Sequence, residues 1–107
     1  MIVNRMEKID ELIKNELALE IRELFPEKFI SITQVRVSKD LGYAKVWIST
    51  TIELEEVVKL CHEKSSQIRK DLSKKVQLRK MPKLHFVADY TAAEADKIER
   101  LIRKIED

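Results

Sequence analysis

Glycine is almost absent from this sequence: Gly42 is the one glycine among 107 residues. Phosphate-binding loops and dinucleotide-binding fingerprints need several backbone positions without a Cβ atom. A single glycine therefore excludes both of these nucleotide-binding motifs.

Side chains that carry metal or covalent chemistry are also scarce. The chain has one cysteine, Cys61, and two histidines, His62 and His85. Neighbouring residues on a helix point about 100° apart, so Cys61 and His62 are badly placed to chelate one ion, and a zinc site usually has four ligands. We expect no metal, no cofactor and no catalytic residue, and we interpret Cys61 as a small buried core residue.

The sequence lacks a long apolar run. No stretch approaches the roughly 20 residues of a membrane span, and the first residues lack the apolar centre of a signal peptide. One cysteine cannot form an internal disulfide. We therefore expect a cytoplasmic protein that does not bind membranes. The length and the 44% hydrophobic content predict a single domain over residues 1–107.

Apolar periodicity in the first half predicts a helix followed by a hairpin. Apolar residues recur at every third or fourth position and predict the helix. It begins after Asn4 and ends before Pro26, because proline stops a helix. Val35 and Val37 indicate a strand over residues 33–38. Ile32 has the opposite parity, so this strand starts late or carries a bulge. Residues 43–49 alternate cleanly and predict the second strand, after a turn at residues 39–42.

The second half returns to a helical period after residue 53. Its apolar stripe breaks at Lys64-Ser65-Ser66 and resumes through Val76, which predicts a kink because adjacent serines compete for backbone hydrogen bonds. Residues 84–88 predict a third strand, and a last helix follows from residue 89 or 91. This order predicts an α+β fold in which helices cover one face of a three-stranded sheet.

Positive charge is concentrated in residues 64–83. This segment has eight Lys or Arg and one acidic residue, Asp71, so it carries +7, whereas the whole chain carries +2 and the remainder −5. On a helical wheel, Ile68, Leu72 and Val76 define a buried side. The opposite side bears Ser66, Lys70, Ser73, Lys74 and Gln77, flanked by Arg69 and Lys80. Such groups bind phosphate oxygens, so we interpret this face as nucleic-acid-binding. A solvated helix face, an anionic membrane and an acidic protein are the alternatives.

Aromatic residues make up only 6% of the chain, which argues against extensive reading of bases. We expect Phe25, Phe29 and Phe86 in the core. Tyr43 and Trp47 share one strand face with Lys45, where the two rings either form an exposed stacking patch or pack beneath a helix. Recognition of nucleic-acid shape and phosphates is therefore favoured over recognition of sequence.

Two stretches resemble the ribosome-binding factor A family. VSKDLGYAKVWIS (residues 37–49) is similar to the hairpin of the family, and SSQIRKDLSKKVQLRKMPKLHFVAD (residues 65–89) is similar to its kinked helix and last strand. The resemblance implies a type II KH-like fold with a C-terminal helix, in which an interrupted helix replaces the Gly-x-x-Gly clamp of ordinary KH domains. The kink of the family commonly reads Ala-x-Gly, where this chain has Lys64-Ser65-Ser66.

The resemblance also implies a function and a set of residues. It implies a non-catalytic factor that binds the immature small (30S) ribosomal subunit, contacts its ribosomal RNA near the 5′-end helix and the decoding region, and assists late maturation, notably in the cold. The implied partners are the subunit and an assembly GTPase, and we expect a monomer. The implied RNA-binding residues are Lys64, Ser65, Ser66, Arg69, Lys70, Lys74, Lys75, Arg79 and Lys80, with Lys39 and Lys45 of the hairpin as further candidates.

Two other classes of function stay open at this point. A protein–protein module, dimeric through Tyr43 and Trp47, would place the basic face against an acidic protein and predicts a stable oligomer. An enzyme that uses Cys61 or His62 predicts an exposed, readily alkylated thiol. Our interpretation predicts a buried thiol that reacts slowly.

Overall fold

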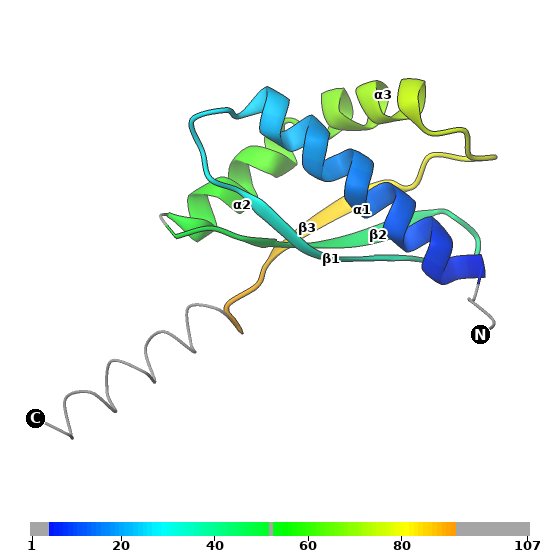
Figure 1. Ribbon diagram of the computed structural model, residues 1–107, viewed down its shortest axis with the longest axis horizontal. Helices are drawn as coiled ribbons and strands as arrows, with labels where there is room; N and C mark the ends of the chain where they lie inside the picture. Colours follow the sequence, from blue (N-terminus) through cyan, green and yellow to red (C-terminus); the bar gives the residue numbers. More distant parts are fainter. Residues whose placement is uncertain (1–4, 52, 92–107) are drawn as a thin grey trace, which may run out of the picture.

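The computed structural model of the chain describes residues 5–51 and 53–91 (Figure 1). The elements in chain order are α1 (Arg5–Leu24), β1 (Ser31–Val37), β2 (Tyr43–Ser49), α2 (Leu54–Glu63), α3 (Ser65–Lys75) and β3 (Lys83–Ala88). The α+β class and the order of elements predicted from the sequence are confirmed over this range. Asn4, after which the first helix was expected to begin, lies outside the described residues, and so does the last expected helix beyond residue 91.

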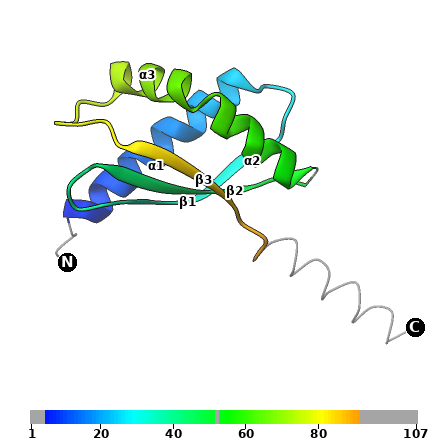
Figure 2. The same ribbon diagram turned by 180° about the vertical axis from the view of Figure 1, so that it is seen from behind.

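The sheet is mixed and has the strand order β1-β2-β3. Strand β1 runs antiparallel to β2, and β3 runs parallel to β2. Helices α1, α2 and α3 lie on the same side of this sheet, as Figure 1 and the reverse view in Figure 2 show. No described element covers the other face of the sheet. Within residues 5–51 and 53–91, no helix combines the length and apolar character that a membrane crossing requires.

The hydrophobic core lies between the helices and the sheet. Ile13 and Leu17 of α1 pack there with Val46 of β2 and Phe86 of β3, all at most 1% exposed. Within the described residues, the apolar positions that the periodicity placed inward are buried or half-buried, and their removal from water stabilises the fold. Phe29 is different, because it is 83% exposed, so its predicted place in the core is wrong. The tight turn from residue 25 to residue 30 holds Phe29 outward and turns the partly buried Ile30 toward the core instead.

A bulge in β1 explains why Ile32 does not alternate in step with Val35 and Val37. The pairing of β1 with β2 shifts between Ile32 and Gln34, so one residue of β1 has no opposite partner. As a result Ile32, Val35 and Val37 are all buried, although Ile32 differs in parity from the other two. Of the two explanations that the sequence left open, the bulge is confirmed.

The turn between β1 and β2 is closed by Asp40. Its Oδ1 accepts hydrogen bonds from the Ser38 hydroxyl at 2.7 Å and from the Gly42 N–H at 3.0 Å. A Cβ atom on Gly42 would lie 3.2 Å from the Asp40 carboxylate, whereas the left-handed position of the turn is Leu41, with φ 60°. The one glycine of the chain therefore permits the close approach of a carboxylate and does not supply a positive φ.

Candidate nucleic-acid interface

The kink expected at Lys64-Ser65-Ser66 is present and needs no glycine. Helices α2 and α3 are separated by one residue, Lys64, with φ −99° and ψ 9°. Residues with a side chain adopt this bridge conformation without entering the left-handed region. Ser65 and Ser66 already belong to the first turn of α3. The departure from the Ala-x-Gly kink therefore introduces no left-handed strain.

The start of α3 is suited to an anion. Its first turn has no acidic residue and no side-chain cap. The first N–H groups of a helix lack partners within the helix, and they carry partial positive charge. Lys64 and Ser66 are exposed beside them, and Ser65 is half-buried. Backbone N–H groups, hydroxyls and an ammonium in one turn are the groups that hold phosphates at helix N-termini.

The exposed face of α3 agrees with the helical wheel. Ile68 and Leu72 are completely buried, while Ser66, Lys70 and Lys74 are exposed on the other side. Neither Lys70 nor Lys74 forms an ion pair within the described part of the chain. Ser73 donates its hydroxyl hydrogen to the Lys70 carbonyl at 2.6 Å, so toward a phosphate it offers no free donor in this rotamer. In the described structure, the charges of these two lysines are therefore available to an anionic partner.

Arg69 has a structural role that its place in the sequence does not reveal. Its Nε donates to the Pro82 carbonyl and its Nη2 donates to the Met81 carbonyl, both at 3.0 Å. Arg69 is half-buried, and these bonds attach α3 to the segment before β3. The guanidinium also lines a shallow depression of about 270 Å³ together with Ser66 and Lys70. Arg69 therefore shapes the face that carries Lys70.

Lys75 is separated from the other lysines of α3, although the sequence grouped them. Its Nζ lies 3.1 Å from Glu20 Oε2 and 3.6 Å from Glu23 Oε2, both on α1. The hydrogen bond to Glu20 is the largest cause that raises the pKa of Lys75 above its ordinary value. Glu20 is only 5% exposed, so Lys75 compensates a buried carboxylate. In this conformation the Lys75 charge is engaged with α1 and is not free to bind RNA.

A second group of cations surrounds a hollow of about 640 Å³ at the end of the molecule that holds the hairpin turn. Lys39 of the turn lines it together with Arg79 and Lys80, which are far away in the sequence, and with Arg5 at the start of α1. The one carboxylate in the lining is Asp40. The Ser38 hydroxyl, the Gly42 N–H and the charge of Lys80 hold the pKa of Asp40 below its ordinary value.

Arg5 is the member of this hollow that the sequence analysis missed. It lies outside the basic segment, and only the packing of α1 brings it to residues 79–80. Lys45, by contrast, joins neither basic group. It lies on β2 with its Nζ 4.8 Å from the centre of the Trp47 ring.

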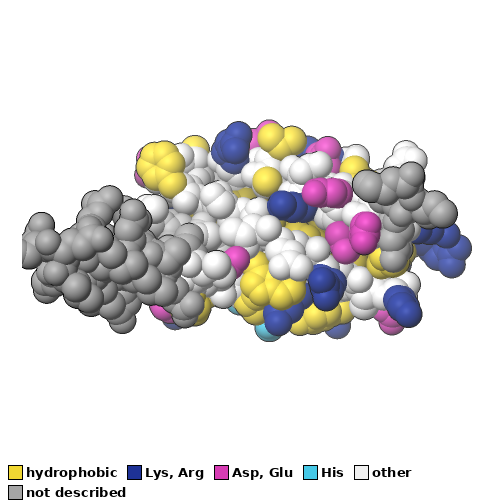
Figure 3. Space-filling model, turned by 60° about the horizontal axis from the view of Figure 1, so that its bottom comes forward, with side chains coloured by type: hydrophobic (Ala, Val, Ile, Leu, Met, Phe, Trp, Pro, Cys, Tyr) yellow, Lys and Arg dark blue, Asp and Glu magenta, His cyan; other side chains and the backbone are white. Residues whose placement is uncertain are grey.

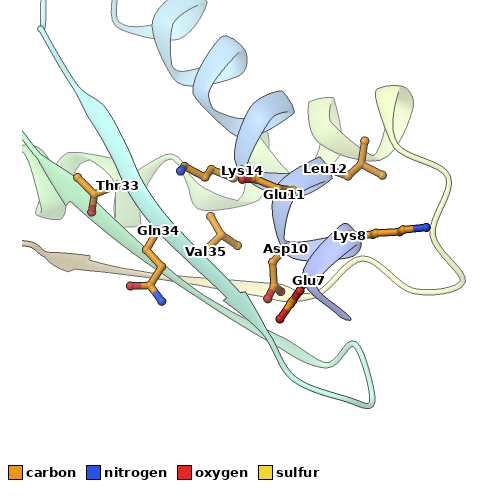
Figure 4. Close-up of a pocket in the computed structure, with 9 residues that line it drawn as sticks. All are labelled: Glu7, Lys8, Asp10, Glu11, Leu12, Lys14, Thr33, Gln34 and Val35. Atoms are coloured by element: carbon orange, nitrogen blue, oxygen red, sulfur yellow. The ribbon is translucent and has the colours of Figure 1, made fainter. Parts of the chain in front are cut away.

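A further hollow between α1 and β1 has a different chemistry (Figure 4). Its volume is about 610 Å³, and Glu7, Asp10 and Glu11 outnumber the lysines in its lining. Asp10 accepts a hydrogen bond from the Val37 N–H at 2.8 Å. This carboxylate-rich hollow is not suited to phosphate.

Cys61 and His62, the two candidates for an enzyme, both have structural contacts. Cys61 is completely buried, and burial raises the pKa of its thiol to about 12. The His62 Nε2–H donates to the Phe86 carbonyl at 2.8 Å. Among the described residues, no group of three His, Cys, Asp or Glu is placed to hold a metal ion. The buried Cys61 confirms the predicted core position and contradicts the exposed thiol predicted for an enzyme that uses Cys61 or His62.

The bent α2–α3 pair over a three-stranded mixed sheet, with exposed cations along α3, defines a type II KH-like protein with a basic interrupted helix. The profile of the ribosome-binding factor A family matches residues 5–102. The chain belongs to the ribosome-binding factor A family, and the resemblance seen in the sequence is confirmed.

Individual relatives agree with this assignment. Ribosome-binding factor A of Acetivibrio thermocellus is 36% identical over 109 residues, which cover 95% of this chain and 89% of the relative. The Chlorobium phaeobacteroides protein is 32% identical over 108 residues, or 94% and 93% of the two chains. The crystal structure of ribosome-binding factor A from Thermus thermophilus shares the fold, with a TM-score of 0.75, 23% identity, and coverage of 79% of this chain and 97% of that one. Thermus thermophilus ribosome binding factor A, as fitted into the cryo-electron-microscopy map of a 30S complex, gives a TM-score of 0.66 at 27% identity, with coverage of 75% and 90%.

Proposed function

We propose that the protein is an assembly factor that binds the ribosomal RNA of the immature small subunit and assists its late maturation without catalysis. The observation that carries the proposal is the α3 face, where Lys70 and Lys74 are exposed and not ion-paired in the described structure, while the opposite side of the helix is fixed in the core. The likeness to a relative placed in a 30S complex supports the choice of the small subunit.

In this proposal the protein acts as a single-domain monomer in the cytoplasm. The start of α3, the α3 face and the hollow at Lys39, Arg79 and Lys80 neutralise backbone phosphates of folded RNA. The docked protein holds a local RNA conformation near the 5′-end helix and the decoding region, and it leaves when that region matures. An assembly GTPase and a special requirement in the cold are part of the same proposal through the family.

Cells that lack the protein provide the test. We expect them to accumulate precursor small-subunit RNA, measured by primer extension at its 5′ end, more strongly at low temperature. The wild-type gene and a Lys28→Glu/Lys59→Glu control are expected to restore processing, and Lys70→Glu/Lys74→Glu is not. Normal processing without the protein, or full rescue by the α3 variant, would contradict the proposal.

A further inference from the structure

The outer face of the sheet carries a second group of aromatic and cationic side chains. Residues of β2 alternate, so Ala44, Val46 and Ile48 face the helices and the residues between them face outward. The open sheet face includes Arg36, Tyr43, Lys45, Trp47, Lys83 and His85, and Gln34 and Val87 lie opposite Trp47 on it. Figure 3 shows apolar side chains with Lys or Arg beside them on this side of the molecule. Tyr43 is 45% exposed, so the alternative in which it packs beneath a helix is wrong for α1, α2 and α3.

Strand pairing arranges these side chains in rows across the sheet. Arg36, Lys45 and His85 are opposite one another on β1, β2 and β3. Tyr43 and Lys83 form the adjacent row, and Trp47 lies on the other side of Lys45. Tyr43 and Trp47 are therefore about 13 Å apart along β2. The face thus has the cations Arg36 and Lys45 in a row between two aromatic positions.

The ring of His85 is held in place. It stacks on Tyr43 with 5.8 Å between the ring centres and 27° between the planes. The His62 ring also meets it edge-on at 5.3 Å, and His62 is itself fixed by its hydrogen bond to the Phe86 carbonyl. A platform that is already ordered binds a planar ligand with a smaller loss of entropy.

The side chains on this face match unpaired nucleotides better than a protein or a duplex. Bases of a single strand stack on aromatic rings while cations bind the phosphates between them, whereas the bases of a duplex are not available for stacking. Protein interfaces are depleted in lysine at their centre, but Lys45 lies on the central strand here. A two-fold contact with a second copy would bring like charges together. The carboxylate of Asp89, at the far end, is engaged by Thr33 at 2.6 Å.

We propose that the open sheet face is a second RNA-binding surface that takes a short unpaired segment. One base stacks on the Tyr43–His85 pair and another on Trp47, where it displaces the flexible Lys45 ammonium toward a phosphate. The helices separate this surface from the exposed face of α3 (Figure 1). The inference goes beyond the proposed function, because the latter needs only the α3 face and the adjoining hollow. A domain with both surfaces contacts two RNA segments at once.

The fluorescence of Trp47 reports binding to the open sheet face directly, because Trp47 is the one tryptophan of the chain. The experiment titrates the full chain with a short single-stranded RNA and with a duplex of the same sequence, and it records tryptophan fluorescence. We expect the single strand to quench Trp47 and the duplex to leave it unchanged. Tyr43→Leu is expected to weaken the single-strand titration at least about fivefold, the lower end of what one stacked base contributes. Tyr43→Phe keeps the ring and is expected to retain wild-type affinity, which separates stacking from a general structural effect.

Lys70→Gln/Lys74→Gln distinguishes this surface from the α3 face. The proposal predicts that single-stranded RNA still quenches Trp47 fluorescence in this variant, although the variant binds the small subunit more weakly. An unquenched wild-type protein would overturn the proposal. So would quenching that is lost in the α3 variant and retained in Tyr43→Leu. A concentration-dependent dimer that Tyr43→Leu dissociates, without quenching by RNA, would assign the face to protein contact and overturn it as well.

Discussion

Replacing Lys70 and Lys74 with glutamine is expected to weaken RNA binding and leave the fold intact. Both side chains are exposed, and neither is ion-paired in the described structure, so each charge is available to a phosphate. Each lost phosphate contact lowers the log–log salt slope by about 0.7 for a single strand and about 0.9 for a duplex. At about 0.1 M salt, the loss of one contact therefore lowers the affinity roughly 5-fold for a single strand and roughly 8-fold for a duplex. Losing both contacts therefore costs roughly 25-fold to 60-fold.

The assay is fluorescence anisotropy with a labelled fragment of small-subunit RNA across a salt series. Lys28→Gln/Lys59→Gln is the matched control, because both lysines are exposed and line a hollow away from α3. The two double variants have the same net charge, so a difference between them reports position alone. We expect the control to keep the wild-type slope. An equal loss of RNA affinity in both variants, or wild-type affinity in the α3 variant, would refute the assignment of phosphate contacts to α3.

Three further predictions concern the groups that support the site. Arg69→Gln removes two hydrogen bonds to backbone carbonyls and is expected to lower the free energy of unfolding by about 1–3 kcal/mol in urea titrations; an unchanged urea midpoint would contradict its structural role. Cys61 is expected to resist iodoacetamide at pH 8 until urea unfolds the protein. Because its folded pKa of about 12 exceeds the ordinary 9.0, it should make stability fall as pH rises above 9.0. The decline should be smaller in Cys61→Ala, and an equal decline in both proteins would contradict this. The Thr33 hydroxyl is the largest cause that lowers the pKa of Asp89, so it adds stability that is present above pH 3.8 and lost below it. Thr33→Val should therefore lose stability at neutral pH but little at pH 2, as acid unfolding curves will show, and a loss that does not depend on pH would exclude this account.

The fold could be predicted from the sequence because its signals are local. The apolar stripe of α1 and the alternation of β2 each need only neighbouring residues, and both elements have the expected type. The bulge near Ile32 was one of two explanations, because parity shows that a conflict exists but not how the backbone resolves it. Phe29 was misplaced because hydrophobicity does not show that a tight loop holds a side chain outward.

The site could be predicted only in part, because its partners are distant in the chain. A helical wheel identifies Lys70 and Lys74 as exposed, since exposure follows from the period of one helix. It cannot identify the ion pair of Lys75, because Glu20 lies 55 residues away. The place of Arg5 beside Lys39, Arg79 and Lys80 likewise depends on how α1 packs.

Co-sedimentation of the purified protein with small ribosomal subunits, immature and mature, across a salt series tests the central claim most directly. The account predicts preferential binding to immature subunits and a steep salt dependence, with each phosphate contributing about 0.7–0.9 to the log–log slope. It also predicts that the slope decreases in Lys70→Gln/Lys74→Gln and not in Lys28→Gln/Lys59→Gln. A folded protein that does not sediment with immature subunits at low salt, or that binds them with no salt dependence, would contradict the account.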